Sequence, residues 1–138
     1  MKIGIADPQA RVRFSLRILL EQQDGWRVIW EAADCQELFD RLHAGPMDLL
    51  LIDCDFSDLP AENMLQLLRQ QFPALIILAM SGRQELRLPA LQSGADAFAC
   101  KAESPLKLLS QIHDLFTRAD GNKIGQQNET NNVTGKCC

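Results

Sequence analysis

Residues 48–58 read DLLLIDCDFSD, and this stretch decides the fold. An unbroken aliphatic run, residues 49–52, leads directly into an acidic cluster of Asp53, Asp55 and Asp58. A short apolar run without alternation is typical of a strand buried on both faces, in the middle of a parallel sheet. Open α/β folds place their sites at the carboxyl ends of such strands. The stretch therefore predicts a central strand that presents Asp53 as a functional carboxylate, and the simpler alternative is that Asp53 only begins a loop.

The same kind of pattern recurs along the chain and predicts its secondary structure. Apolar and β-branched runs predict strands over Lys2–Ala6, Trp26–Ala32, Asp48–Asp53, Leu75–Met80 and Ala97–Cys100. Apolar residues at helical spacing predict helices over Arg11–Gln23, Asp34–Ala44, Ala61–Gln71 and Glu85–Ser93, and a last helix that starts at Ser104-Pro105. Five strands that alternate with five helices predict a doubly wound, five-stranded parallel α/β sheet of the flavodoxin-like type.

Composition and charge limit the class of protein and its partners. The net charge of −4 argues against direct binding of nucleic acid, which usually requires a basic excess. We see no secretory signal and no apolar run near the roughly 20 residues that span a membrane, so we expect a cytoplasmic protein without a membrane partner. We expect residues 1–118 to form one domain and the polar residues 119–138 to be a disordered tail. The role of Cys137-Cys138 in that tail stays open.

Four polar residues follow or end the predicted strands. Asp7 ends the first strand, Asp53 the third, Ser81 the fourth and Lys101 the fifth. In a flavodoxin-like strand order these residues meet at one edge of the sheet. Carboxylates are ligands for Mg²⁺, a hydroxyl and an ammonium bind phosphoryl oxygens, and Asp53 is placed to act as the nucleophile. Each residue alone is more often structural or solvated, so the prediction of a phosphoryl site depends on their joint placement.

At this point the chain resembles a known family, the receiver domain of two-component response regulators. The resemblance covers about residues 1–117 and is carried by IADPQARVRFSLRILLE, PMDLLLIDCDFSD, FPALIILAMSG and SGADAFACK. It implies that Asp53 is the phosphoacceptor, that Ser81 is the switch hydroxyl and that Lys101 is the family lysine. Phe98 stands at the position of the aromatic switch residue.

The resemblance also implies a metal site, in which one ligand is changed. Mg²⁺ would be held by Asp7, Asp53 and the backbone carbonyl of Asp55. The family normally has a second acid after the first strand, and Pro8 stands at that position, so Mg²⁺ binding is expected to be weakened. The loop after Ser81 is about two residues short, and an alignment without that gap would place Ala79 at the switch position. The hydrophobic-Pro pair that usually follows the phosphoacceptor is replaced by Phe56-Ser57.

These residues are compatible with three functions. The favoured one is a receiver that takes a phosphoryl group on Asp53 from a histidine kinase or phosphotransfer protein. Such a receiver is not an enzyme beyond its own phosphorylation and dephosphorylation, and it acts on a downstream protein, a fused output domain or a second copy in a homodimer. The alternative is a pseudo-receiver, which binds proteins without phosphoryl chemistry. A flavin carrier or small-molecule enzyme is disfavoured because no glycine-rich phosphate loop is present.

Overall fold

Five parallel strands form one sheet in the order β2-β1-β3-β4-β5, in a computed structural model that describes residues 1–118. The strands are β1 (Lys2–Ala6), β2 (Arg27–Ala32), β3 (Leu49–Asp53), β4 (Ile76–Ser81) and β5 (Ala97–Cys100). All neighbouring pairs run parallel. The predicted flavodoxin-like class is thereby confirmed. The predicted disordered tail and Cys137-Cys138 lie outside the described residues.

Helices connect the strands and cover both faces of the sheet. They are α1 (Ala10–Glu21), α2 (Cys35–Ala44), α3 (Ala61–Gln71), α4 (Arg87–Gln92) and a last helix over residues 105–118. Most boundaries lie within two residues of the predictions. The predicted segment Glu85–Ser93 is divided, because a 3₁₀ turn over Gln84–Leu86 precedes α4 and Pro89 falls in the first turn of α4. Proline is tolerated there, since N–H groups of a first turn have no partner within the helix.

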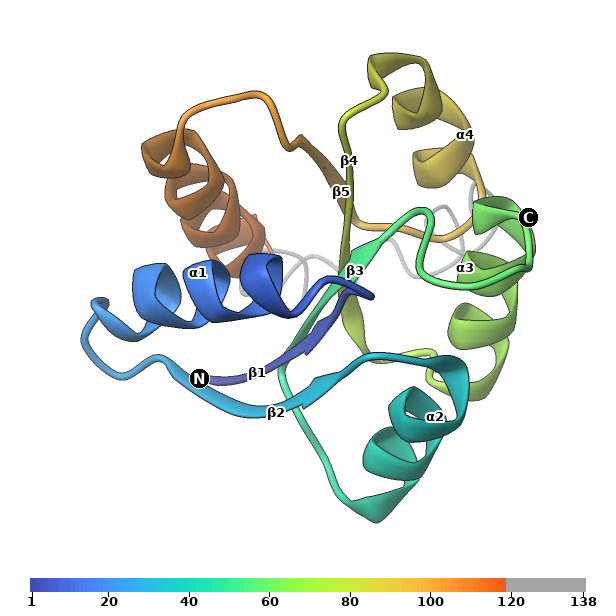
Figure 1. Ribbon diagram of the computed structural model, residues 1–138, viewed down its shortest axis with the longest axis horizontal. Helices are drawn as coiled ribbons and strands as arrows, with labels where there is room; N and C mark the ends of the chain where they lie inside the picture. The colour runs from blue at the N-terminus through green and yellow to red at the C-terminus, as the bar shows by residue number, and fades with distance from the viewer. Residues whose placement is uncertain (119–138) are drawn as a thin grey trace, which may run out of the picture.

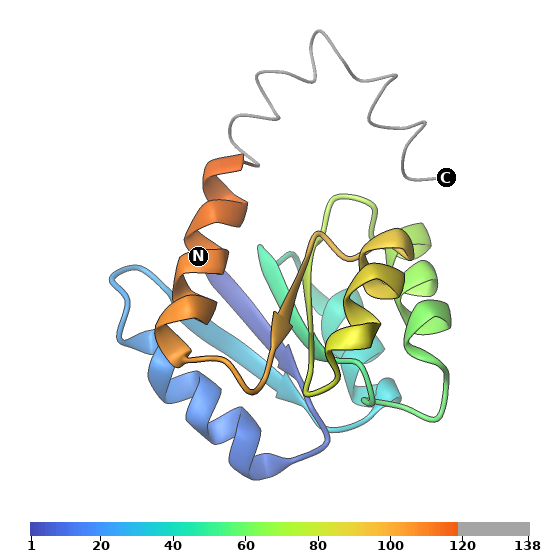
Figure 2. The same ribbon diagram turned by 90° about the horizontal axis from the view of Figure 1, so that it is seen from above.

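Each face of the sheet packs against its own set of helices (Figure 1). On one face, Leu50 and Ile52 of β3 join the core under α2, α3 and α4. On the other, Leu49 and Leu51 join the core under α1 and the last helix. Figure 2 shows α1 and the last helix beside each other on their face of the sheet. The central strand is therefore covered twice, which explains why it carries an apolar run instead of an alternating one.

The turn into α2 shows how local sequence fixes an element. The Asp34 side chain accepts a hydrogen bond from the Glu37 N–H at 2.9 Å, and a Glu37 carboxylate oxygen accepts one from the Ala33 N–H at 2.9 Å. This is a capping-box variant in which the return bond goes to the residue before the N-cap. Within residues 1–118, the structure contains no helix that combines the length and the apolar character needed to cross a membrane.

Candidate functional site

Asp7 and Asp53 lie side by side at the carboxyl ends of β1 and β3. Ala6 pairs with Ile52 in the sheet, so the next residue of each strand is a carboxylate that points to the face of α1 and the last helix. Asp7 is completely buried and Asp53 is 7% exposed. The Gln9 N–H donates to Asp7 Oδ1 at 2.8 Å, and the Asp7 N–H donates to the Ala32 carbonyl at 3.1 Å.

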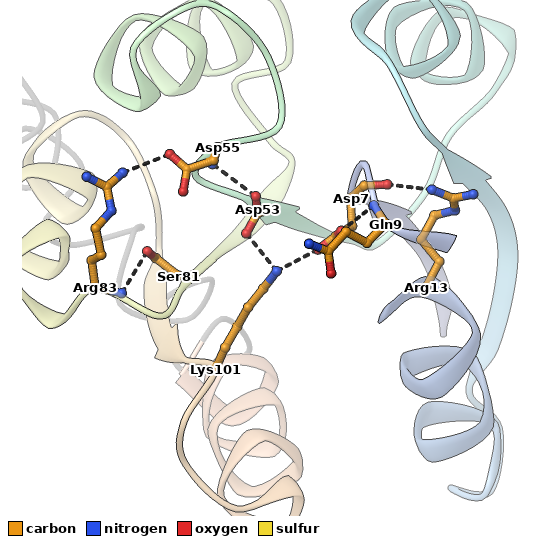
Figure 3. A network of polar contacts seen from close by, with 8 residues as sticks. All are labelled: Asp7, Gln9, Arg13, Asp53, Asp55, Ser81, Arg83 and Lys101. Atoms are coloured by element: carbon orange, nitrogen blue, oxygen red, sulfur yellow. Dashed lines mark hydrogen bonds and ion pairs between the residues drawn. The ribbon is translucent and has the colours of Figure 1, made fainter. Parts of the chain in front are cut away.

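Lys101 joins the two carboxylates (Figure 3). Its Nζ lies 2.7 Å from Asp7 Oδ2 and 2.8 Å from Asp53 Oδ1. The backbone of Lys101 is fixed beyond the end of β5 by a 2.9 Å hydrogen bond to the carbonyl of Ser81. Burial alone would lower the pKa of Lys101, but the hydrogen bonds to Asp53 and Asp7 and the two negative charges outweigh it, and the pKa is raised. The ammonium is therefore charged and centred between the carboxylates at neutral pH.

The loop after β3 binds the remaining oxygen of Asp53. The Asp55 N–H donates to Asp53 Oδ2 at 3.0 Å, and the Phe56 N–H donates to the Asp53 carbonyl at 3.1 Å. The Asp55 carboxylate turns away from this contact and lies 2.7 Å from Nη2 of Arg83 (Figure 3). Of the predicted metal-site residues, the structure thus brings together the side chains of Asp7 and Asp53, and it places only the main chain of Asp55 against them.

Ser81 is close to this group in the sheet, but its hydroxyl is turned elsewhere. Asp53 pairs with Met80, so Ser81 is one residue further along β4 and belongs to the opposite face. Its side chain is buried, and its Oγ accepts a hydrogen bond from the Arg83 N–H at 3.0 Å (Figure 3). The structure therefore places the predicted switch hydroxyl at the correct edge, facing its own loop instead of the carboxylates.

Two arginines of the site were not singled out by sequence. The Arg13 guanidinium donates to the Asp7 carbonyl at 2.7 Å and to Glu31 at 3.2 Å, and its side chain is only 16% exposed. Arg83 joins the loops after β3 and β4 through Asp55. Helical spacing assigns Arg13 to the polar side of α1 but gives no partner. Asp55 and Arg83 each stand two residues after the end of neighbouring strands, β3 and β4. This equal spacing could have indicated the ion pair between them.

The residues at this edge include oxygen ligands suited to a hard cation, but they offer fewer carboxylates than the family normally has. The Asp7 and Asp53 carboxylates and the Asp55 carbonyl are oxygen ligands of the kind that Mg²⁺ accepts, completed by water. Pro8 supplies no carboxylate. Among residues 1–118, no cluster of three or more histidine, cysteine, aspartate or glutamate side chains is arranged to hold a metal ion. The donor set that the resemblance implies is therefore two carboxylates and a main-chain oxygen.

Comparison with known proteins decides the family. The family model described as response regulator receiver domain matches residues 3–113. The chain belongs to the response regulator receiver family. Receiver domains are signalling domains of two-component systems, so the resemblance drawn from the sequence is confirmed.

Relatives of this receiver include longer regulatory proteins. The uncharacterized transcriptional regulatory protein YhcZ of Bacillus subtilis is 35% identical over 117 residues, which is 82% of this chain and 55% of that protein. The oxygen regulatory protein NreC of Staphylococcus aureus strain JH9 is 30% identical over 121 residues, or 84% of this chain and 55% of NreC. The receiver therefore spans about half the length of the curated relatives it matches.

Solved structures agree on the fold. A LuxR-family response regulator from Aurantimonas sp. SI85-9A1 superposes with a TM-score of 0.78 at 25% identity, covering 84% of each chain. The isolated receiver domain of RcsB from Salmonella enterica serovar Typhimurium, in the presence of phosphomimetic BeF₃⁻, gives a TM-score of 0.79 at 22% identity, covering 85% of this chain and 88% of that one.

Proposed function

We propose that Asp53 of this receiver accepts a phosphoryl group from the phosphohistidine of a histidine kinase or phosphotransfer protein. The observation that carries the proposal is the bridge from Lys101 Nζ to both Asp7 and Asp53. In this bridge a fixed positive charge lies beside the Asp53 carboxylate at the carboxyl edge of a parallel sheet, where open α/β folds build their sites, and this supports Asp53 as the nucleophile. The buried Asp7 holds the ammonium from the side opposite to Asp53.

The transfer is a displacement at phosphorus. An oxygen of Asp53 forms the new P–O bond while the P–N bond of the phosphohistidine breaks. The imidazole takes up one proton from solvent and leaves as neutral imidazole. Lys101 Nζ stands 2.8 Å from Asp53 Oδ1, so its positive charge lies beside the carboxylate that would carry the phosphoryl group. The transition state of such transfers is stabilised chiefly by positioning and by charge, which is what these residues supply.

A divalent cation is part of the proposal. Asp7, Asp53 and the carbonyl of Asp55 would hold Mg²⁺, which supplies positive charge for the phosphoryl oxygens. Pro8 removes one carboxylate from the donor set, so we propose a weak site. Lys101 would supply part of the positive charge that the phosphoryl oxygens require, because its ammonium already lies against both carboxylates.

The switch would run through Ser81 and Phe98. In the structure, Ser81 Oγ accepts from the Arg83 N–H. We propose that, once Asp53 is phosphorylated, the hydroxyl turns to the phosphoryl oxygens and the loop that contains Arg83 follows. Phe98, which is 5% exposed, belongs to the core beneath α4, and its carbonyl accepts a 2.9 Å hydrogen bond from Gln111 of the last helix. Movement of β5 would therefore reach the last helix, from which a downstream protein, an output domain or a second copy would read the state.

Intact-mass spectrometry tests the phosphoacceptor. The protein is incubated with Mg²⁺ and a small phosphodonor such as acetyl phosphate, beside the variants Asp53→Ala and Asp58→Ala. Asp58 is an exposed acid of the same loop and serves as the matched control. We expect a gain of one phosphoryl group in the wild type and in Asp58→Ala, and none in Asp53→Ala.

Two outcomes would contradict the proposal. Uptake by Asp53→Ala equal to the wild type would mean that another residue is modified. If the wild type takes up no phosphoryl group at high Mg²⁺, and circular dichroism shows that it is folded, the result would favour the pseudo-receiver, which binds its partner without phosphoryl chemistry.

We also propose that the protein works in the cytoplasm, and that a kinase or phosphotransfer protein is its phosphoryl donor.

A further inference from the structure

Asp55 and Asp7 lie on opposite sides of the Asp53 carboxylate (Figure 3). The Asp55 N–H donates to Asp53 Oδ2 at 3.0 Å, so the residue directly borders the nucleophile. Figure 3 shows Asp7, the residue before Pro8, on the other side of Asp53. The Asp55 side chain is 65% exposed. It is therefore a carboxylate next to Asp53 that is free of packing and can change its direction by rotation about its own bonds.

Arg83 holds this carboxylate in its present direction. Nη2 of Arg83 lies 2.7 Å from Asp55 Oδ1, and both side chains are more than half exposed. The pair joins the loop after β3 to the loop after β4. Exposed ion pairs contribute little free energy and are readily exchanged for another partner. The contact is thus strong enough to bias the Asp55 carboxylate and too weak to fix it.

A divalent cation at the Asp7–Asp53 pair would lack one negative charge. Lys101 already contacts both carboxylates, and Pro8 adds none. Mg²⁺ prefers carboxylate and water oxygens, and it retains several waters that need acceptors of their own. The Asp55 carboxylate is the acid that borders Asp53 and is not already bound to Lys101. The Asp55 carboxylate can supply the missing negative charge by binding the cation directly or by accepting a hydrogen bond from a metal-bound water.

We propose that Asp55 supplies, by its side chain, the negative charge that Pro8 takes from the cation site, and that Arg83 competes with the cation for it. The inference rests on the proposed function for the location of the cation. Cation binding and the Asp55–Arg83 pair then oppose each other, and each weakens the other by the same factor.

The competition has a consequence for the switch segment. The Arg83 N–H donates to Ser81 Oγ at 3.0 Å, while the Arg83 guanidinium binds Asp55. A cation that takes Asp55 from Arg83 releases one of these two Arg83 contacts, which help to hold the loop. Metal binding therefore loosens the segment that keeps the Ser81 hydroxyl turned towards its own loop, before any phosphoryl group arrives.

Mg²⁺ titration without a phosphodonor tests the proposal. The dissociation constant is measured by following backbone amide signals in NMR spectra of the full chain and of Arg83→Gln and Asp55→Asn. Arg87→Gln and Asp58→Asn are the controls, because each removes the same charge from an exposed residue, on α4 and on the loop after β3. They measure the general effect of charge on cation binding.

The expected changes follow from the weakness of an exposed ion pair. Arg83→Gln binds Mg²⁺ about two- to five-fold more tightly than Arg87→Gln. Asp55→Asn binds at least about five-fold more weakly than Asp58→Asn, since a charged ligand is lost. In the Asp55→Asn background, Arg83→Gln has no effect beyond that of Arg87→Gln, because the two residues act through one contact. The Arg83 amide signal shifts on Mg²⁺ addition in the wild type and not in Asp55→Asn.

Three outcomes overturn the proposal: equal affinity of Arg83→Gln and Arg87→Gln, equal affinity of Asp55→Asn and Asp58→Asn, or no Mg²⁺ binding by any variant. The phosphoacceptor role is judged separately, from the mass gain at Asp53. If the wild type gains a phosphoryl group while Asp55→Asn binds Mg²⁺ as Asp58→Asn does, this inference fails and the proposed function stands. If the affinities differ as expected and no mass is gained, the proposed function fails.

Discussion

Lys101 and Asp7 are 94 residues apart in the sequence, and their charged groups lie 2.7 Å apart. The contact spans four neighbouring strands of the sheet. β1 and β5 are separated in the sheet by β3 and β4, and the long lysine side chain crosses this distance over Asp53. Asp7 is wholly buried, while the Lys101 side chain is 30% exposed. The lysine therefore neutralises a carboxylate that water does not reach.

Replacing Lys101 by methionine keeps most of the side-chain volume and removes the charge. We expect a loss of about 1–3 kcal/mol in the free energy of unfolding at pH 7, because two buried carboxylates lose their shared cation; partial exposure of the lysine reduces the usual cost of breaking a buried pair. Urea unfolding measures this. Lys107→Met is the control, since Lys107 pairs with Glu103 on the surface and should cost under about 1 kcal/mol. An equal loss in both variants would contradict the burial argument.

Sequence was sufficient to place the carboxylate pair and the lysine. Asp7, Asp53 and Lys101 each stand where an apolar run stops, and parallel strands put all such positions at one edge. The β3 prediction succeeded because a strand covered on both faces leaves an unbroken apolar run, which few other structures leave in so short a segment.

Sequence was not sufficient for the direction of the loop side chains. The resemblance placed Ser81 at the switch position without giving the direction of its hydroxyl, which accepts a hydrogen bond from the Arg83 N–H. The pair of Asp55 and Arg83 was not foreseen either. These contacts depend on the backbone path of two loops, and loop residues have no periodicity from which a direction could be derived. The metal and switch roles of these residues stay predictions.

Stability at alkaline pH is expected to depend on Cys54. Burial raises the pKa of the Cys54 thiol from 9.0 to about 11, and the negative charges of Asp53 and Asp55 add to the shift. Between these values the thiol ionises in the unfolded chain and stays protonated in the folded one, so the unfolded state is favoured as pH rises. The wild type should lose about 1–2 kcal/mol from this residue between roughly pH 9 and pH 11.

Urea unfolding under reducing conditions, at about pH 8, 9 and 10, checks this expectation. Cys54→Ala should show a shallower fall of stability with pH than the wild type. Part of the fall will remain, because the raised pKa of Lys101 acts in the same direction: its stabilising contribution is complete below about 10.5 and is lost as pH rises through the raised value. Identical slopes in both proteins would show that Cys54 ionises as freely in the folded state as in the unfolded one.

Arg69 is expected to hold the opposite edge of the sheet together. Its guanidinium donates to the carbonyls of Gly94, Pro73 and Leu75 and pairs with Asp96 at 2.7 Å. Arg69→Ala should lower the free energy of unfolding by about 2–4 kcal/mol, because several carbonyls and a carboxylate lose their donor. Arg69→Lys should recover only part, since a single ammonium cannot reproduce the fork of donors. Full recovery by lysine, measured in the same urea titration, would show that charge alone matters.

Gly4 is expected to be required for the packing of β1, the strand that leads to Asp7. A Cβ built at Gly4 would lie 2.5 Å from Cζ2 of Trp30 and 2.7 Å from Cε of Met47. The methionine end can move, but Trp30 is only 7% exposed and its ring is part of the buried core. Gly4→Ala should therefore cost about 1–3 kcal/mol, as overpacking of a core does.

Gly45→Ala provides the matched control for Gly4→Ala. Gly45 has φ 174°, which is extended backbone open to any residue, and a Cβ there meets nothing within 4 Å. The change should alter stability by less than about 0.5 kcal/mol. A double-mutant cycle then locates the clash: in the Trp30→Phe background, where the indole atoms are gone, Gly4→Ala should cost clearly less than in the wild type. If the cost is unchanged, the strain arises from the backbone of β1, whose register with β2 shifts between Ile3 and Gly4, and not from the Trp30 ring.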